Sequence, residues 1–252
     1  MRKPIIAGNW KMNKTRDEAL QFIYAVNMDL PSREYVETVI CPQAPVLRDL
    51  VKRQGEALRI GAQTMHEATD GAYTGEISAA LLENLGVDYV IIGHSERREY
   101  FGDTDARVNL KLHQAFRHHL TPILCIGEQL EDRENDATET VVGTQLDAAL
   151  KGLGKDQIEH LVIAYEPVWA IGTGKTATIE QAEATIAFIR RRITETIDEA
   201  VADKVRILYG GSVNPDNLPA LLKTPNIDGA LIGGASLSAK AFIQMADAAL
   251  NR

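Results

Sequence analysis

Residues 89–98 have the sequence YVIIGHSERR, and this pattern of an apolar run that ends in polar residues recurs along the whole chain. The run YVII is β-branched and aromatic, as buried strands are, and the glycine and charged residues after it mark its end. Similar runs return at intervals of roughly 30 residues, about the length of one strand–helix unit. The predicted strands are Ile5–Asn9, Val36–Cys41, Leu58–Gln63, Tyr89–Gly93, Pro122–Ile126, Leu161–Tyr165, Val205–Tyr209 and Gly229–Ile232.

The segments between these strands carry apolar residues at every third or fourth position. Such spacing places one apolar stripe on a helix, which must then pack against a sheet. Residues 179–197 are an example, and Thr178, with Gln181 three positions later, is a predicted cap for that helix. Ser238 is a predicted cap for the last helix.

Continuous alternation of strands and helices predicts parallel strands covered by helices. Eight such units in 252 residues predict an α/β fold with a closed eight-stranded parallel (β/α)₈ barrel, in a single domain over residues 1–252. An open doubly wound sheet is the alternative. It lacks support because residues 8–13, GNWKMN, contain one glycine where a dinucleotide fingerprint needs three.

Composition narrows the function classes. The chain has 27 basic and 35 acidic residues, a formal net charge of −8, so we expect no nucleic-acid partner. No apolar run approaches the roughly 18 residues of a membrane span, and the opening MRKPIIA is too short for a signal peptide, so we expect no membrane association and a cytoplasmic location. Cys41 and Cys125 lie in separate apolar runs, and we expect buried, reduced thiols.

Polar residues and glycines follow five of the predicted strands. Because function collects at the carboxyl ends of barrel strands, we expect these residues to share one face. They are Asn9 and Lys11, His94, Glu166, the segment Gly210-Gly211-Ser212, and the pair Gly233-Gly234.

This set of side chains suits a proton transfer. Glycine pairs let backbone N–H groups approach an anion, and the loops after strands seven and eight are the usual phosphate position in a barrel. A carboxylate and an imidazole beside a cation can move a proton from carbon while a carbonyl oxygen is stabilised. We therefore expect no cofactor and no metal. The P-loop-like segment GTGKT at 172–176 fails as a motif because Trp169 stands where the first glycine is required.

Longer motifs resemble the triosephosphate isomerase family. The matching segments are residues 8–13, 93–98, 125–128, 164–176, 209–213 and 228–237. The resemblance runs from the first strand to the last helix. It implies a TIM barrel and a cofactor-independent isomerase of glycolysis and gluconeogenesis, which interconverts dihydroxyacetone phosphate and D-glyceraldehyde 3-phosphate through an enediolate.

The resemblance also implies a role for each residue. Glu166 corresponds to the catalytic base and His94 to a neutral electrophile, as is known for this family. Lys11 would stabilise the negative charge of the substrate, Asn9 would orient it, and Glu96 would support the lysine. The groups that would hold the phosphate are the backbone N–H groups of Gly172, Ser212, Gly233 and Gly234.

Two loops carry further implications of the resemblance. Pro167 to Thr176 resembles a mobile lid over the active site. Gln63 to Glu76, with Thr74 at its tip, resembles the loop that inserts into a second subunit and implies a homodimer. Thr64 departs from the asparagine expected after Gln63, which affects only the packing of that interface.

Two other functions fit a phosphate-binding barrel. An aldolase or lyase would need a Schiff-base lysine, and the lysines near the rim are Lys11 and Lys175. A sugar-phosphate binding protein without catalysis is the other alternative, since a fold does not fix a function. Borohydride trapping identifies the aldolase, and binding of phosphoglycolate without turnover identifies the binding protein.

Overall fold

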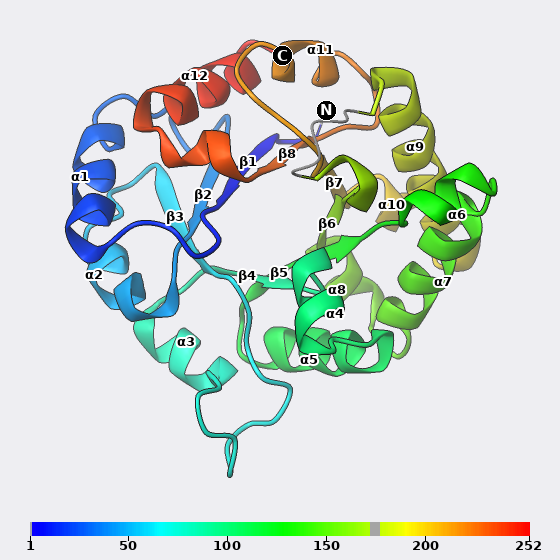
Figure 1. Ribbon diagram of the computed structural model, residues 1–252, viewed down its shortest axis with the longest axis horizontal. Helices are drawn as coiled ribbons and strands as arrows, with labels where there is room; N and C mark the ends of the chain where they lie inside the picture. The colour runs from blue at the N-terminus through cyan, green and yellow to red at the C-terminus, as the bar shows by residue number, and fades with distance from the viewer. Residues whose placement is uncertain (1, 172–176) are drawn as a thin grey trace.

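A computed structural model describes residues 2–171 and 177–252 (Figure 1). Within these residues, eight parallel strands pair in chain order, and the last strand pairs with the first to close a barrel. The strands are β1 (Ile5–Asn9), β2 (Glu37–Cys41), β3 (Leu58–Ala62), β4 (Tyr89–Ile92), β5 (Thr121–Ile126), β6 (Val162–Tyr165), β7 (Arg206–Tyr209) and β8 (Gly229–Ile232). The predicted fold class is therefore confirmed, and each strand begins and ends within one residue of its predicted position.

Helices surround the barrel and cover its outer face (Figure 1). They are α1 (Arg16–Val26), α2 (Leu47–Val51), α3 (Ala79–Leu85), α4 (Ser95–Phe101), α5 (Asp105–Arg117), α6 (Leu130–Glu134), α7 (Thr138–Leu150), α8 (Lys155–Glu159), α9 (Ile179–Thr196), α10 (Glu199–Ala202), α11 (Leu218–Leu221) and α12 (Ala239–Leu250), with 3₁₀ turns η1 (Ala44–Val46), η2 (Val168–Ala170) and η3 (Gly234–Leu237). Thr178 and Gln181 form the predicted capping box of α9, and Ser238 caps α12. No helix in the described ranges is both long and apolar enough to cross a membrane.

Side chains alternate between two apolar layers along each strand, because successive residues of a strand point to opposite faces. Ile5 and Ala7 of β1 belong to the cluster inside the barrel, whereas Ile6 belongs to the larger cluster between the strands and the helices. Cys41 and Cys125 are buried free thiols of the inner cluster, as predicted. Both faces of the sheet are thus buried, which leaves the ends of the strands as the places where polar groups can gather.

A buried ion pair ties α9 to the amino-terminal end of the barrel. Arg190 of α9 donates to Asp228 Oδ2 (2.7 Å) and to the main-chain carbonyls of Ala202 (2.6 Å) and Val205 (2.9 Å). Asp228, which is fully buried just before β8, also accepts the N–H of Ile207 in β7 (3.0 Å). The Arg190 guanidinium therefore donates both to the segment that precedes β7 and to the segment that precedes β8.

Replacement of Arg190 by alanine tests how much these contacts contribute to stability. It removes one buried cationic partner of the Asp228 carboxylate and the donor that the carbonyls of Ala202 and Val205 share, so we expect the free energy of unfolding to fall by about 3–5 kcal/mol. Urea unfolding followed by circular dichroism measures the change. Arg191→Ala, one position along the same helix, is the matched control, because Arg191 is exposed and pairs only at the surface. Equal unfolding midpoints for the two variants would contradict the assignment.

Candidate active site

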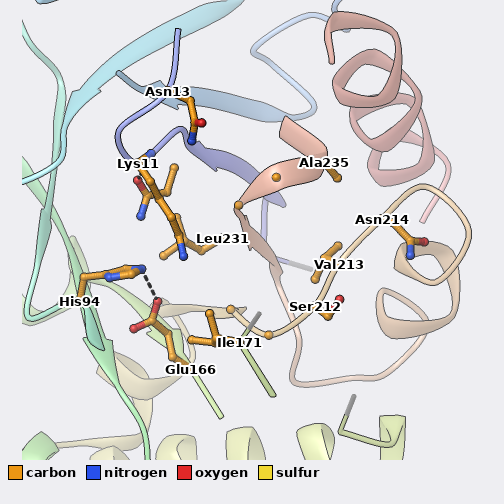
Figure 2. Close-up of a pocket in the computed structure, with 15 residues that line it drawn as sticks. Lys11, Asn13, His94, Glu166, Ile171, Ser212, Val213, Asn214, Leu231 and Ala235 are labelled. Atoms are coloured by element: carbon orange, nitrogen blue, oxygen red, sulfur yellow. Dashed lines mark hydrogen bonds and ion pairs between the residues drawn. The ribbon is translucent and has the colours of Figure 1, made fainter. Parts of the chain in front are cut away.

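A pocket of about 480 Å³ opens at the carboxyl ends of the strands (Figure 2). Its volume lies within the range of small-molecule sites, roughly 300–1,000 Å³. The residues that line it are Asn9, Lys11, Asn13, His94, Glu166, Ile171, Gly210, Gly211, Ser212, Val213, Asn214, Leu231, Gly233, Gly234 and Ala235. The structure thus brings together the predicted site residues of five strand ends. Glu96 lies beside this pocket, and Gly172 lies outside the described residues.

Glu166 is held at the end of β6 by close packing of the neighbouring strands. A Cβ at Gly127 would clash with the Glu166 carbonyl, and one at Gly210 would lie 2.9 Å from Glu166 Cγ. The side chain is 2% exposed. Its Oε2 accepts the N–H of Ser95 (3.0 Å), and its Oε1 lies 3.1 Å from His94 Nε2. Both contacts connect β6 to the loop after β4, two strands away in the barrel.

His94 follows β4 and caps α4, so the fold fixes both ring nitrogens. Its Nδ1 accepts the N–H of Glu96 (3.2 Å) at the start of that helix. An acceptor nitrogen carries no proton, which assigns the proton of the neutral ring to Nε2, the atom that faces Glu166 and the pocket. This geometry supports the neutral electrophile that the resemblance implies.

The pKa values of this pair shift in opposite directions. Burial lowers the pKa of His94, but the charge and hydrogen bond of Glu166 outweigh burial and raise it above its usual value. Burial raises the pKa of Glu166, but His94, the Ser95 N–H and Lys11 together lower it below its usual value. Each group therefore depends on the other for its charge state, and when the carboxylate moves away burial opposes the charged form of each.

Lys11 has an unusual backbone conformation for a non-glycine residue, with φ of 52°. Its N–H donates to the side-chain oxygen of Asn9 (3.0 Å), and its carbonyl accepts from Gln63 Nε2 (2.7 Å). Its Nζ donates to Glu96 Oε1 (2.7 Å) at the edge of the pocket. Contacts from β1, from the loop after β3 and from α4 hold this strained conformation. The ammonium group points toward Glu166 and His94 (Figure 2).

Backbone groups line the opposite side of the pocket. Ser212 follows β7 and appears across the pocket from His94 (Figure 2). Gly233 is the cap of the 3₁₀ turn η3, which begins at Gly234, and a Cβ at Gly234 would meet nothing within 4 Å. An anion in the pocket can therefore approach the main chain at Gly234 closely.

The described part of the predicted lid is anchored by a buried carboxylate. Glu128, fully buried, accepts from Trp169 Nε1 (2.9 Å) and from Tyr165 OH (3.1 Å), and its carbonyl accepts the N–H of Val168 (3.1 Å). Burial raises the pKa of Glu128, although these donors oppose the shift. The segment that follows Glu166 is thus fixed at its beginning. Residues 172–176 of the lid, with Lys175 among them, lie outside the described ranges.

Several lining residues were not predicted from the sequence. Leu231 of β8 and Ile171 are apolar and line the pocket, and Figure 2 draws Ile171 beside Glu166. The alternation of β8 gave a signal for Leu231, since it places that residue inside the barrel near the strand end. Ile171 falls within the segment that resembles a lid, but its contact with the pocket depends on the fold of η2 and the turn after it.

Comparison with known proteins gives the family. The profile of the triosephosphate isomerase family matches residues 4–249. A protein named triosephosphate isomerase from Clostridium botulinum is 54% identical over 243 residues, which cover 96% of this chain and 98% of the relative. One of the same name from Clostridium perfringens is 53% identical over 247 residues, 97% of this chain and 99% of the relative. With the barrel and the pocket described above, this chain belongs to the triosephosphate isomerase family.

Proposed function

We propose that this chain, folded as a single domain, catalyses the interconversion of dihydroxyacetone phosphate and D-glyceraldehyde 3-phosphate in glycolysis and gluconeogenesis. The observation that carries the proposal is the contact of Glu166 with His94 at 3.1 Å, in a pocket that Lys11 also lines. A base, a hydrogen-bond donor and a cation around one small cavity suit proton transfer next to a carbonyl. Family membership supports the same reaction.

Glu166 acts as the base in this proposal. It removes a proton from C1 of dihydroxyacetone phosphate, which leaves an enediolate, and returns the proton to C2. Its pKa is low while it accepts from Ser95 and His94. When it turns from these donors toward the substrate, beside Ile171 and Leu231, the loss of donors and the apolar surroundings raise its pKa and make it a stronger base.

His94, Lys11 and Asn9 stabilise the oxygen atoms in this proposal. The Nε2–H of His94 donates to the carbonyl oxygen as it becomes negative and passes the proton between O1 and O2. The ammonium group of Lys11, fixed by Glu96, faces the same negative charge, and Asn9 positions Lys11 through its side-chain oxygen. Backbone N–H groups at Ser212, Gly233, Gly234 and Gly172 hold the phosphate.

The aldolase alternative is not favoured. Its Schiff base requires a neutral amine, whereas Lys11 Nζ is bound to the Glu96 carboxylate at 2.7 Å. A coupled assay separates the three functions. Glyceraldehyde 3-phosphate should be converted without added cofactor or metal, and in D₂O the product dihydroxyacetone phosphate should carry deuterium at C1. A binding protein would give no conversion, and an aldolase would be labelled at lysine by borohydride.

Glu166→Asp tests the base assignment. The shorter side chain withdraws the carboxylate by roughly 1 Å, and misplacement of that size costs on the order of 10²-fold in rate. We expect kcat to fall by about that factor with a modest change in KM, as measured in the coupled assay. Glu134→Asp, on exposed α6, is the matched control. A nearly unchanged kcat of the Glu166→Asp enzyme would show that Glu166 is not the base.

The pair of shifted pKa values gives a second test. In the free enzyme, NMR titration of the His94 ring should give a pKa above the usual value for histidine, because Glu166 raises it. Glu166→Gln removes the negative charge and leaves burial, which disfavours the imidazolium. The pKa of His94 should then fall below its usual value. A pKa that is the same in both proteins would show that the two groups are not coupled.

A homodimer formed through the loop Gln63 to Glu76 is part of the proposal. This loop projects from the body of the molecule between β3 and α3 (Figure 1). Large apolar side chains are exposed near it and near the pocket, with Met12 86% and Phe101 61% exposed. Met12, Phe101 and Thr64 also line a hollow of about 210 Å³ beside Lys11. Insertion of the partner's loop there would cover the apolar surface and support Lys11.

We further propose a cytoplasmic location.

Thr74→Arg tests this interface. An arginine at the loop tip is too long for a hollow of about 210 Å³ and brings its charge next to Lys11 and Arg97 as well as Glu96, so we expect monomers in sedimentation-velocity runs at micromolar concentration. A lower kcat should accompany dissociation, because Lys11 loses support. Thr140→Arg, the same change on an exposed face of α7, should leave the assembly unchanged. A Thr74→Arg protein that sediments like the unmodified protein would contradict the proposed interface.

A further inference from the structure

The amino-terminal face of the barrel, opposite the active site, carries a group of basic side chains. Two hollows meet there at Arg2. One, of about 550 Å³, is lined by Arg2, Lys3, Asp203, Lys204 and Arg206, and the other, of about 470 Å³, includes Lys223 and Arg252. We call the six basic residues Arg2, Lys3, Lys204, Arg206, Lys223 and Arg252 the basal cluster. Within the two linings, Asp203 is the only carboxylate side chain.

The basal cluster is not neutralised by its ion-pair partners. Asp228 is shared by three arginines, Arg2 (2.8 Å), Arg190 (2.7 Å) and Arg252 (3.6 Å). Glu37 is shared by Lys3 and Arg33. With Lys204 paired to Glu159, the six cluster residues plus Arg190 and Arg33 make eight cations, against the four carboxylates Asp203, Asp228, Glu37 and Glu159. Four positive side-chain charges remain, in a chain whose net charge is −8.

Three cationic groups of the cluster have donors to spare. In the described part of the chain, Arg206 and Lys223 make no ion pair and no side-chain hydrogen bond. Arg252 Nη1 is buried and makes no hydrogen bond in the described residues, and its contact with Asp228 Oδ1 is a long one of 3.6 Å. Arg206 and Lys223 can therefore give their donors to an anionic ligand in the adjacent hollows, and Arg252 can add a further donor.

We propose that the basal cluster is a binding site for a small polyphosphate anion. Guanidinium groups pair with phosphate oxygens through two parallel hydrogen bonds, and the six cations are spread over two joined hollows, so a ligand with several linked phosphates fits better than one orthophosphate. The volumes of the hollows are those of small-molecule sites. The acidic remainder of the chain repels a long polyanion, which argues for a compact ligand over a polymer.

Titration with inorganic tripolyphosphate tests this site. Isothermal titration calorimetry at low salt, with phosphoglycolate present to fill the active-site pocket, should give one tripolyphosphate bound per chain. Arg206→Gln and Lys223→Gln should each weaken Kd by about tenfold, the usual effect of losing a charge-assisted hydrogen bond. Neither side chain has a partner in the fold, so both variants should keep the unmodified Tm and kcat.

Two controls separate the basal cluster from the active site and from net charge. Lys240→Gln removes one charge from an exposed position on α12 and should leave Kd within roughly twofold. Lys11→Ala, which alters the active-site pocket, should also leave it unchanged. The proposal is overturned if tripolyphosphate does not bind, if Lys11→Ala abolishes binding, or if Arg206→Gln and Lys223→Gln bind as tightly as Lys240→Gln. These outcomes do not depend on whether the chain isomerises triose phosphates.

Discussion

The Glu166 carboxylate accepts the N–H of Ser95 and faces His94 across the top of the barrel, and the organisation of the site depends on this contact. Ser95 and Glu166 are 71 residues apart in sequence, and only closure of the strands into a barrel brings them together. A carboxylate that is 2% exposed would be costly without donors. The free protein supplies them from the start of α4, and the proposed reaction requires the carboxylate to leave them for the substrate.

Polar groups gather at the two ends of a barrel that is apolar between them. Inner and outer apolar layers fill both faces of the sheet, so charged groups of the strands are found at the strand ends. At the carboxyl ends, Lys11 adopts a left-handed backbone that Asn9 and Gln63 hold in place. At the amino-terminal ends, Asp228 and Arg190 satisfy main-chain groups of β7 and its neighbours. One end therefore stores strain beside the pocket, while the other end contributes to stability.

The sequence predicted the barrel because its local signals agree: β-branched runs, helical stripes and caps such as Thr178 all indicate the same eight units. The site residues could be predicted as far as they lie at the carboxyl end of a strand or within two residues of it, as Asn9, His94 and Glu166 do. Other features depend on contacts across the barrel and have no local pattern. The positive φ of Lys11 and the donors from Trp169 and Tyr165 to Glu128 are examples. The link between Arg190 and Asp228 joins residues 38 apart in sequence, which periodicity cannot reveal.

The most direct test of the account is a crystal structure with phosphoglycolate bound. We expect the phosphate at the main chain of Ser212, Gly233 and Gly234, with the ligand carboxylate between Lys11 and His94. Glu166 should have left the Ser95 N–H and lie against the ligand. A ligand bound elsewhere, or one that leaves the contacts of Glu166 with Ser95 and His94 intact, would contradict the claim that these strand ends converge on one substrate.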